Sequence, residues 1–229
     1  MLLKLKLSFL SYWHTGTGLG DGSGHDAAVL RDLHGLPYFP GKALRGILRN
    51  ALEKAQTLGW FSDLDDNLTS QLFGSSHLNE SQDRLTASGN VFVSSAELPD
   101  AERDFLKQPE NSALKNSLFS TVASTAIDEK TGGAKPTSLR TTEVVVPLEL
   151  EAEVELSNLL TPGQIQQSIQ AIELALPLIE HIGAKRTRGL GKVAIKMEIY
   201  NAGVNLLACT VKTNLFSVKT PQQVVSILA

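Results

Sequence analysis

The sequence predicts an α+β fold: a single ferredoxin-like (RRM-like) β-α-β-β-α-β core that carries a long insertion. Two segments alternate apolar and charged residues with a period of two, and two others place apolar residues at helical spacing. The predicted order is strand, helix, strand, long insertion, strand, helix, strand, which is the order of one such unit. The chain shows no internal repeat and no linker, so we expect residues 1–229 to form one decorated domain.

The first half of the predicted unit begins with a strand over residues 3–9. Leucine or phenylalanine alternates there with lysine or serine, which indicates a half-buried strand with a basic outer face. Residues 14–32 are rich in glycine and lack apolar periodicity, and loops of that length inside a compact domain are usually functional. Glycine and proline turn signals at 35–41 then precede a helix expected over 42–57.

The middle of the chain is weakly patterned. Residues 60–89 read as irregular, with one apolar turn at 72–74, and a short strand is expected at 91–93. Residues 99–135 show no clear period. They end in a glycine-, lysine- and threonine-rich stretch that is typical of an exposed hairpin or flexible loop.

The second half is clearer. Residues 148–156 alternate apolar residues with glutamate, which predicts a strand with one acidic face. A helix should begin with Thr161 as its N-cap, break near Pro177 and end with Gly183 as its C-terminal cap. Further strands are predicted over 193–200 and 204–212.

Composition excludes several classes of protein. The single cysteine, Cys209, rules out an intrachain disulfide and fits a reducing compartment, so we expect a cytoplasmic protein. No apolar run of membrane-spanning length occurs, and neither a P-loop, a GxSxG nor an HExxH motif is present. The histidines lack close metal-ligand spacing. The net charge of −3 argues mildly against a free-standing nucleic-acid binder.

The positive charges are nevertheless clustered. Together with Arg31, three short segments hold eleven of the 21 basic residues, ten of which we predict to contact RNA: Lys42, Arg45, Arg49, Lys130, Lys135, Arg140, Lys185, Arg186, Arg188 and Lys192. Any one cluster alone would read as a solvated face. Because they accompany glycine-rich loops, which let a backbone approach a phosphate closely, we favour a sequence-independent phosphate-binding groove.

Five stretches resemble a known family. "HDAAVLRDLHGLPYFPGKALRGILRNALE" at 25–53 is similar to the first signature of the RAMP superfamily, and "LFGSS" at 72–76 and "GNVFVSSAEL" at 89–98 are similar to its next stretch. "TAIDEKTGGAKPTSLRTTEVVVP" at 125–147 resembles the thumb hairpin of backbone subunits of type III CRISPR effector complexes. "IGAKRTRGLGKV" at 182–193 looks like the glycine-rich loop of the superfamily.

The resemblance implies a core with a thumb inserted at about 122–142 and a glycine-rich loop at 183–192. It implies that copies or paralogues of the subunit stack along a guide crRNA together with other effector subunits. Each thumb would displace one base of the guide–target duplex. The paired target RNA could then be cut at regular spacing, which would serve antiviral defence. No membrane partner is expected.

The resemblance also points to a cleavage residue. The cutting aspartate of such subunits lies before the "LP-PG" stretch, and Asp26 is the matching position. A carboxylate there could accept the 2′-OH proton or hold a divalent cation, Mg²⁺ or Mn²⁺, needed for cleavage only. Asp21 and Asp32 are nearby competitors, with Asp32 expected to cap a turn, and His25 is expected to be a neighbour.

The sequence departs from the family pattern in the shortened turn after Asp32 and in "VSSAEL", where an aspartate–alanine pair is common. Four aromatic residues could stack on bases: Tyr12, Trp13, Tyr38 and Phe39. Tyr38 and Phe39, which lie between two prolines, are better explained as core anchors. Two alternatives stay open beside a cleaving backbone subunit. One is a non-catalytic RNA-binding subunit of the same assembly, and the other is a guide-processing ribonuclease that relies on histidine.

Overall fold

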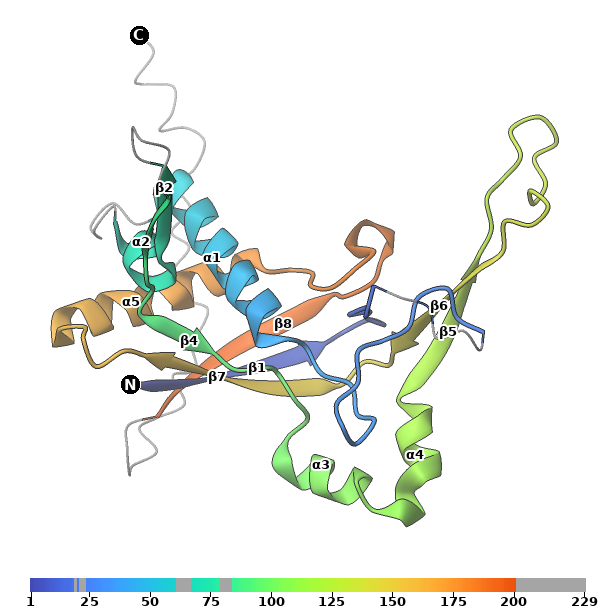
Figure 1. Ribbon diagram of the computed structural model, residues 1–229, viewed down its shortest axis with the longest axis horizontal. Helices are drawn as coiled ribbons and strands as arrows, with labels where there is room; N and C mark the ends of the chain where they lie inside the picture. The colour runs from blue at the N-terminus through green and yellow to red at the C-terminus, as the bar shows by residue number, and fades with distance from the viewer. Residues whose placement is uncertain (19, 21–23, 61–66, 79–83, 201–229) are drawn as a thin grey trace, which may run out of the picture.

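A four-stranded antiparallel sheet with two helices over one face forms the body of the protein (Figure 1). The computed structural model describes residues 1–18, 20, 24–60, 67–78 and 84–200. The strand order is β4–β7–β1–β8. The elements of this body are β1 (Leu2–Phe9), α1 (Gly41–Thr57), β4 (Val91–Val93), β7 (Glu149–Leu156), α5 (Pro162–Ala175) and β8 (Val193–Tyr200). The α+β class is confirmed, and the predicted order of these six elements agrees with the structure.

The alternating residues of the sheet explain its two faces. The apolar side chains of β1 and β7 are buried against the helices, while their lysines and glutamates lie on the outer face. There the ammonium of Lys4 lies 2.8 Å from Glu151, and that of Lys6 lies 2.9 Å from Glu198. The hydrogen bond to Glu151 raises the pKa of Lys4. A charged outer face of this kind holds its strands in register without needing cover from another layer.

Helix α5 begins as the sequence predicts. The Thr161 hydroxyl accepts from the backbone N–H of Gln164, and the Gln164 side chain accepts from the backbone N–H of Thr161, so the two form a capping box. The helix ends at Ala175 and is followed by a 3₁₀ turn, η2 (Leu176–Leu178), which confirms the break near Pro177.

The predicted C-terminal cap at Gly183 is wrong, because helical structure has already ended at Leu178. Gly183 instead has a φ of +89° and packs on the His14 carbonyl, where a Cβ would not fit. The glycine is required by a close approach of two loops rather than by a helix end.

Residues 60–89 were expected to be irregular, and this expectation is wrong. They contain α2 (Leu68–Phe73), β2 (Ser75–Leu78) and β3 (Arg84–Ala87), the last two paired as a small antiparallel ribbon. The helix is only six residues long and the strands are polar, so neither shows a clear hydrophobic period.

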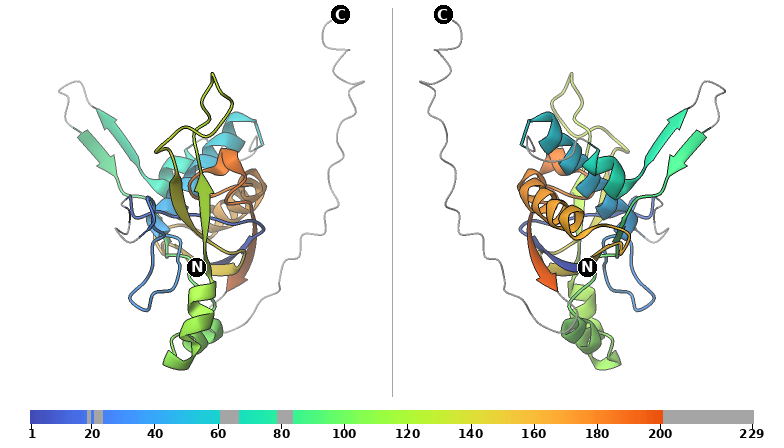
Figure 2. Two further views of the ribbon diagram at one scale, coloured as in Figure 1. Left: turned by 90° about the vertical axis from the view of Figure 1, so that its right-hand side faces the viewer. Right: turned by 90° about the vertical axis from the view of Figure 1, so that its left-hand side faces the viewer.

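The long insertion between β4 and β7 holds two short helices and a hairpin. Its elements are α3 (Asp100–Leu106), η1 (Pro109–Asn111), α4 (Ser112–Ser117), β5 (Phe119–Ser124) and β6 (Arg140–Val145). The helices were not predicted. The exposed hairpin was predicted, and residues 125–139 indeed extend beyond the paired strands and project away from the body (Figures 1 and 2).

Among the residues described, no helix has both the length and the apolar run needed to cross a membrane. The strand predicted at 204–212 lies outside the described residues.

Candidate nucleic-acid interface

Strand β6 is the point where three distant segments meet. Ala27, in the loop before α1, bridges to Thr142 in parallel, and Trp13, just after β1, bridges to Val145. Lys185, in the glycine-rich loop, donates from its ammonium to the Thr142 hydroxyl at 2.5 Å. Consecutive residues of one strand therefore join the loop that carries Asp26 to the loop that carries the predicted phosphate contacts.

Asp26 is exposed and anchored at both backbone and side chain. Its backbone N–H donates to the Thr141 carbonyl at 2.9 Å, and its Oδ2 accepts from the Thr141 backbone N–H at 2.7 Å. The Thr141 hydroxyl also donates to the Gly24 carbonyl at 2.6 Å. Within the described part of the chain, Oδ1 has no hydrogen-bond partner, whereas Oδ2 is held by Thr141.

A buried carboxylate stabilises the same loop from below. Glu143 is only 6% exposed, and its Oε2 accepts from the Val29 backbone N–H at 2.9 Å. Its Oε1 lies 2.5 Å from the Arg31 guanidinium. A buried carboxylate needs such compensation, because an unpaired charge there would be costly. Glu143 therefore ties residues 27–31 to β6.

The two histidines near this site have different environments. His14 is 5% exposed, with Nδ1 lying 2.7 Å from the Glu143 carbonyl and its ring packed against Gly16. His25 is partly exposed, and its Nε2 lies 2.8 Å from the Thr121 hydroxyl on β5. His25 thus connects the Asp26 loop to the root of the hairpin, and its expected role as a neighbour of the cleavage group stays a prediction.

The glycine-rich loop is shaped by close packing against the segment after β1. Gly191 has a φ of +75° and lies so close to the Ile182 carbonyl that no Cβ could be accommodated. Lys185 adopts the left-handed conformation, with a φ of +56°, and precedes the 3₁₀ turn η3 (Arg186–Arg188). This uncommon conformation for a residue with a Cβ directs the Lys185 side chain back toward β6.

The remaining cations of the loop and hairpin point to solvent. All six are exposed: Lys130, Lys135, Arg140, Arg186, Arg188 and Lys192. At the hairpin tip the backbone N–H and the hydroxyl of Thr131, together with the backbone N–H of Lys130, donate to Asp128. These hydrogen bonds, led by that of the Thr131 backbone, lower the pKa of Asp128. The carboxylate thus orders the turn that carries Lys130.

The three cations predicted on α1 differ in their surroundings. Lys42 is exposed, whereas Arg49 forms an i,i+4 ion pair with Glu53 at 2.8 Å. Arg45 is partly buried: its guanidinium donates to the Phe73 carbonyl at 2.9 Å and more weakly to the Val91 carbonyl at 3.4 Å. The structure thus gives Arg45 a role in joining α1 to α2 and β4, and its RNA contact stays a prediction.

Other predicted residues are placed plainly. Trp13 is fully buried and stacks on Phe9 with a centroid separation of 4.4 Å, so the suggestion that it stacks on bases is wrong. Phe39 is buried as a core anchor, and Tyr12 is exposed. Asp32 caps its turn, since Oδ1 accepts at 2.8 Å from the backbone N–H groups of both His34 and Leu36. Asp21 lies outside the described residues.

The described ranges contain no group of three or more acidic, histidine or cysteine side chains that could together hold a metal ion. Asp26 offers a single free carboxylate oxygen. Mg²⁺ is commonly held by one or two carboxylates together with phosphate oxygens of a substrate. The arrangement at Asp26 therefore fits a cation that is shared with a bound phosphate.

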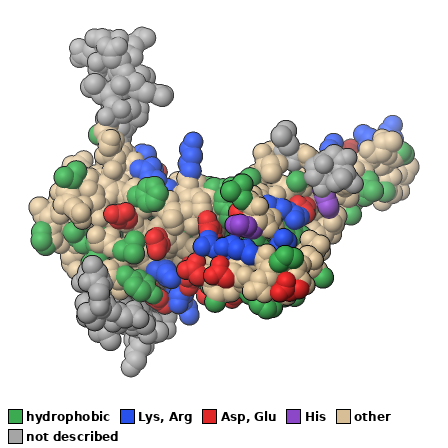
Figure 3. Space-filling model, turned by 60° about the horizontal axis from the view of Figure 1, so that its bottom comes forward, with side chains coloured by type: hydrophobic (Ala, Val, Ile, Leu, Met, Phe, Trp, Pro, Cys, Tyr) green, Lys and Arg blue, Asp and Glu red, His purple; other side chains and the backbone are tan. Residues whose placement is uncertain are grey.

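The outer sheet face is a poor surface for RNA. It carries the four glutamates of β7 with Glu198 of β8, against three lysines, Lys4, Lys6 and Lys196. In the face shown by Figure 3, acidic and basic side chains lie interleaved, with no continuous basic field. A polyanion would gain little on such a surface.

Comparison with known proteins decides the family. The model of the RAMP superfamily matches residues 6–194, which is most of the chain. The protein belongs to the RAMP superfamily. No curated protein matches the sequence.

Two solved structures show the same fold as this RAMP protein. One is described as the cryo-EM structure of the type III-B Cmr-beta bound to cognate target RNA; a chain of it aligns with a TM-score of 0.62 and 11% identity. The other is the apo state of type III-B Cmr-beta, with a TM-score of 0.63 and 12% identity. Each alignment covers 86% of this chain and 97% of the other.

The sequence did not predict the residues that hold the Asp26 loop against β6. Glu143 and Thr142 were read only as part of a hairpin, and Phe119 was not singled out. Their partners in the loop before α1 lie 88 or more residues away (119 − 31 for Phe119 and Arg31), so no local pattern reveals them. The one available signal was an acidic residue directly before the apolar run at 144–146.

Proposed function

We propose that this RAMP protein is a backbone subunit of a type III CRISPR ribonucleoprotein, which binds the phosphates of a guide crRNA and cleaves the paired target RNA. The observation that carries the proposal is the attachment of Asp26 and Lys185 to adjacent residues of β6, at the root of a projecting hairpin. A candidate cleavage group and a candidate phosphate contact are thereby held at a fixed separation.

The architecture supports the finer fold assignment. In the sheet order β4–β7–β1–β8, each helix follows a central strand and precedes an edge strand, as expected of a ferredoxin-like core. The β5–β6 hairpin with residues 125–139 would be the thumb, and residues 183–192 the glycine-rich loop. The fold of chains in Cmr-beta complexes supports neighbouring effector subunits and RNA as partners.

The chemistry assigned to Asp26 follows from its anchored carboxylate. With Oδ2 held by the Thr141 backbone, Oδ1 can accept the proton of a ribose 2′-OH that attacks the adjacent phosphate in line. The P–O5′ bond breaks, which leaves a cyclic phosphate, and the departing 5′ oxygen takes a proton from water. In the alternative role, Oδ1 would instead hold a divalent cation that neutralises charge on that phosphate. Lys185 and Arg188 would fix the guide strand through its phosphates.

The test uses the complex reconstituted with guide RNA, matched target RNA and a divalent cation. We expect products at fixed spacing and, for Asp26→Asn, cleavage slowed roughly 10²- to 10⁴-fold with target affinity unchanged. Asp104→Asn on α3 is the matched control, because it removes an exposed carboxylate far from β6 in sequence. Full cleavage by Asp26→Asn would remove the catalytic assignment.

A non-catalytic subunit of the same assembly is the second candidate. The observation that favours it is the lack, among the described residues, of any group of three or more acidic, histidine or cysteine side chains that could hold a metal ion at Asp26. Normal RNA binding without any cleavage by the wild-type complex would support this candidate. Cleavage that survives Asp26→Asn but is lost in His25→Ala would instead support a histidine-dependent ribonuclease.

A further inference from the structure

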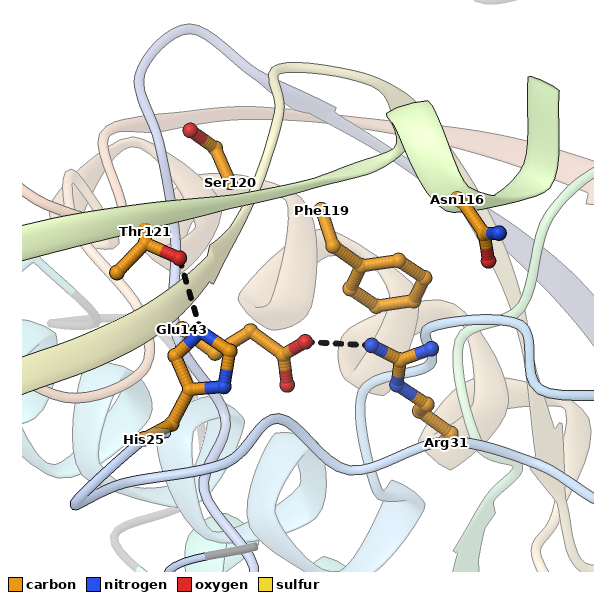
Figure 4. Close-up of a pocket in the computed structure, with 7 residues that line it drawn as sticks. All are labelled: His25, Arg31, Asn116, Phe119, Ser120, Thr121 and Glu143. Carbon is orange, nitrogen blue, oxygen red and sulfur yellow. Dashed lines mark hydrogen bonds and ion pairs between the residues drawn. The ribbon is translucent and has the colours of Figure 1, made fainter. Parts of the chain in front are cut away.

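An open pocket of about 240 Å³ lies between the Asp26 loop and the root of the hairpin. Figure 4 shows the side chains that line it, which come from the loop before α1, from α4 and from β5 and β6: His25, Arg31, Asn116, Phe119, Ser120, Thr121 and Glu143. Pockets for drug-sized ligands usually measure roughly 300–1,000 Å³. This pocket therefore suits a single ring system better than a larger molecule.

One wall of the pocket is a flat cationic platform. The Arg31 guanidinium lies 3.5 Å from the centroid of the Phe119 ring, and Glu143 fixes it by an ion pair of 2.5 Å (Figure 4). The Arg31 side chain is still 35% exposed. Splayed-out bases of single-stranded RNA stack on guanidinium planes as well as on aromatic rings. Because Phe119 and Glu143 hold the guanidinium in place, little order has to be gained on binding.

The edges of the pocket are polar. The Asn116 amide offers both donors and an acceptor, and the Thr121 hydroxyl, which already pairs with His25, can accept a further hydrogen bond. Mixed donors and acceptors around a flat platform match the edge of a nucleobase. A phosphate would instead meet the Glu143 carboxylate, which carries the wrong sign.

We propose that this pocket receives one unstacked nucleobase of the bound RNA, stacked on the Arg31 guanidinium. The inference rests on the proposed function, since it requires the chain to bind RNA. His25 lines the pocket and directly precedes Asp26, so the nucleotide whose base enters the pocket lies beside the candidate cleavage group. Withdrawing that base from the stack would free its own sugar and phosphate to adopt in-line geometry.

The experiment measures target binding by the assembled ribonucleoprotein in an Asp26→Asn background. Arg31→Lys keeps the charge opposite Glu143 but removes the planar guanidinium, and Phe119→Leu keeps an apolar side chain but removes the ring. The matched controls on α3 are Arg103→Lys and Phe105→Leu. An abasic nucleotide is placed at each successive position of the target in turn.

We expect each pocket variant to weaken target binding about 5- to 100-fold, the usual range for the loss of one stacked base. Within each interval of the cleavage spacing, an abasic site at one position should weaken binding similarly. On such a target, Arg31→Lys should cause no further loss of affinity, and the control variants should have no effect on any target. Equal affinities for every abasic target, or an Arg31→Lys defect that persists at all of them, would overturn the pocket assignment. Failure of the proposed function would look different, because the wild-type ribonucleoprotein would then bind no target.

Discussion

The ammonium of Lys185 donates to the hydroxyl of Thr142, and the residue before Thr142 holds the carboxylate of Asp26. The loop of Asp26 and the loop of Lys185, which are 159 residues apart in the chain (185 − 26), thus attach to one two-residue stretch of β6. A change at either residue should be coupled to the other, because both loops contact adjacent residues of this strand.

The first prediction concerns the charge on Lys185 and Arg188. Replacing Lys185 with Met, or Arg188 with Ala, should weaken RNA binding about equally for all guide sequences. Each lost phosphate contact should reduce the log–log salt slope by roughly 0.7 to 0.9. Fluorescence anisotropy over a salt series measures both effects.

Lys107→Met on α3 serves as the control for this experiment, since Lys107 pairs with Asp104 and was not predicted to contact RNA. A sequence-selective loss of binding in Lys185→Met would show that the residue reads bases instead of phosphates.

The second prediction concerns Glu143. Glu143→Gln should lower the free energy of unfolding by about 1–3 kcal/mol, because it removes the charge that compensates Arg31 and weakens the acceptor for Val29. Urea unfolding followed by circular dichroism gives the value. The m-value should not change, since the surface exposed on unfolding is the same.

Glu153→Gln, on the outer face of β7, is the matched control and should change stability by less than about 0.5 kcal/mol. Equal stability of Glu143→Gln and Glu153→Gln would mean that the buried carboxylate contributes nothing to the fold.

The third prediction separates structure from binding on α1. Arg45→Ala should destabilise the isolated chain by about 1–3 kcal/mol, because the Phe73 carbonyl and, more weakly, the Val91 carbonyl lose a donor at buried residues. Lys42→Ala, on the exposed side of the same helix, should leave stability unchanged and affect only RNA binding. Thermal melting of both variants decides between these roles. An Arg45→Ala variant as stable as Lys42→Ala would show that Arg45 is not needed for the fold and would support its predicted contact with RNA.

The sequence predicted the central sheet well because its period is a local property. The alternation in β1 and β7 follows from one face of each strand being buried, and the capping box of α5 is contained in four residues. The short helices α2, α3 and α4 were not predicted, because each has only six or seven residues and a helical period cannot be recognised over so short a stretch.

The candidate site was predicted only in part. Asp26 and Lys185 were found because they belong to recognisable stretches, but the contacts that bring them together are between segments far apart in sequence. Trp13 shows the converse error. It was suggested as a residue that could stack on bases, whereas full burial gives it a core position against Phe9.

The last prediction concerns pH and the ion pair between Lys6 and Glu198 on the outer face of the sheet. The hydrogen bond from Lys6 lowers the pKa of Glu198 below its usual 4.5, and the same contact raises the pKa of Lys6 above 10.5. The pair should therefore stabilise the fold fully between these values. Its contribution should fade as the pH falls through the folded pKa of Glu198, and again as the pH rises through that of Lys6.

Lys6→Met should accordingly cost about 0.2–1 kcal/mol near neutral pH, the usual range for an exposed ion pair, and less at high salt. The difference in unfolding free energy from the wild type should shrink toward both ends of the pH range. Lys196→Met is the control on the same face, because Lys196 forms no ion pair within the described residues. Denaturant titrations across the pH range measure the difference, and a Lys6→Met penalty that is constant with pH would assign the loss to the packing of the lysine stem instead of its charge.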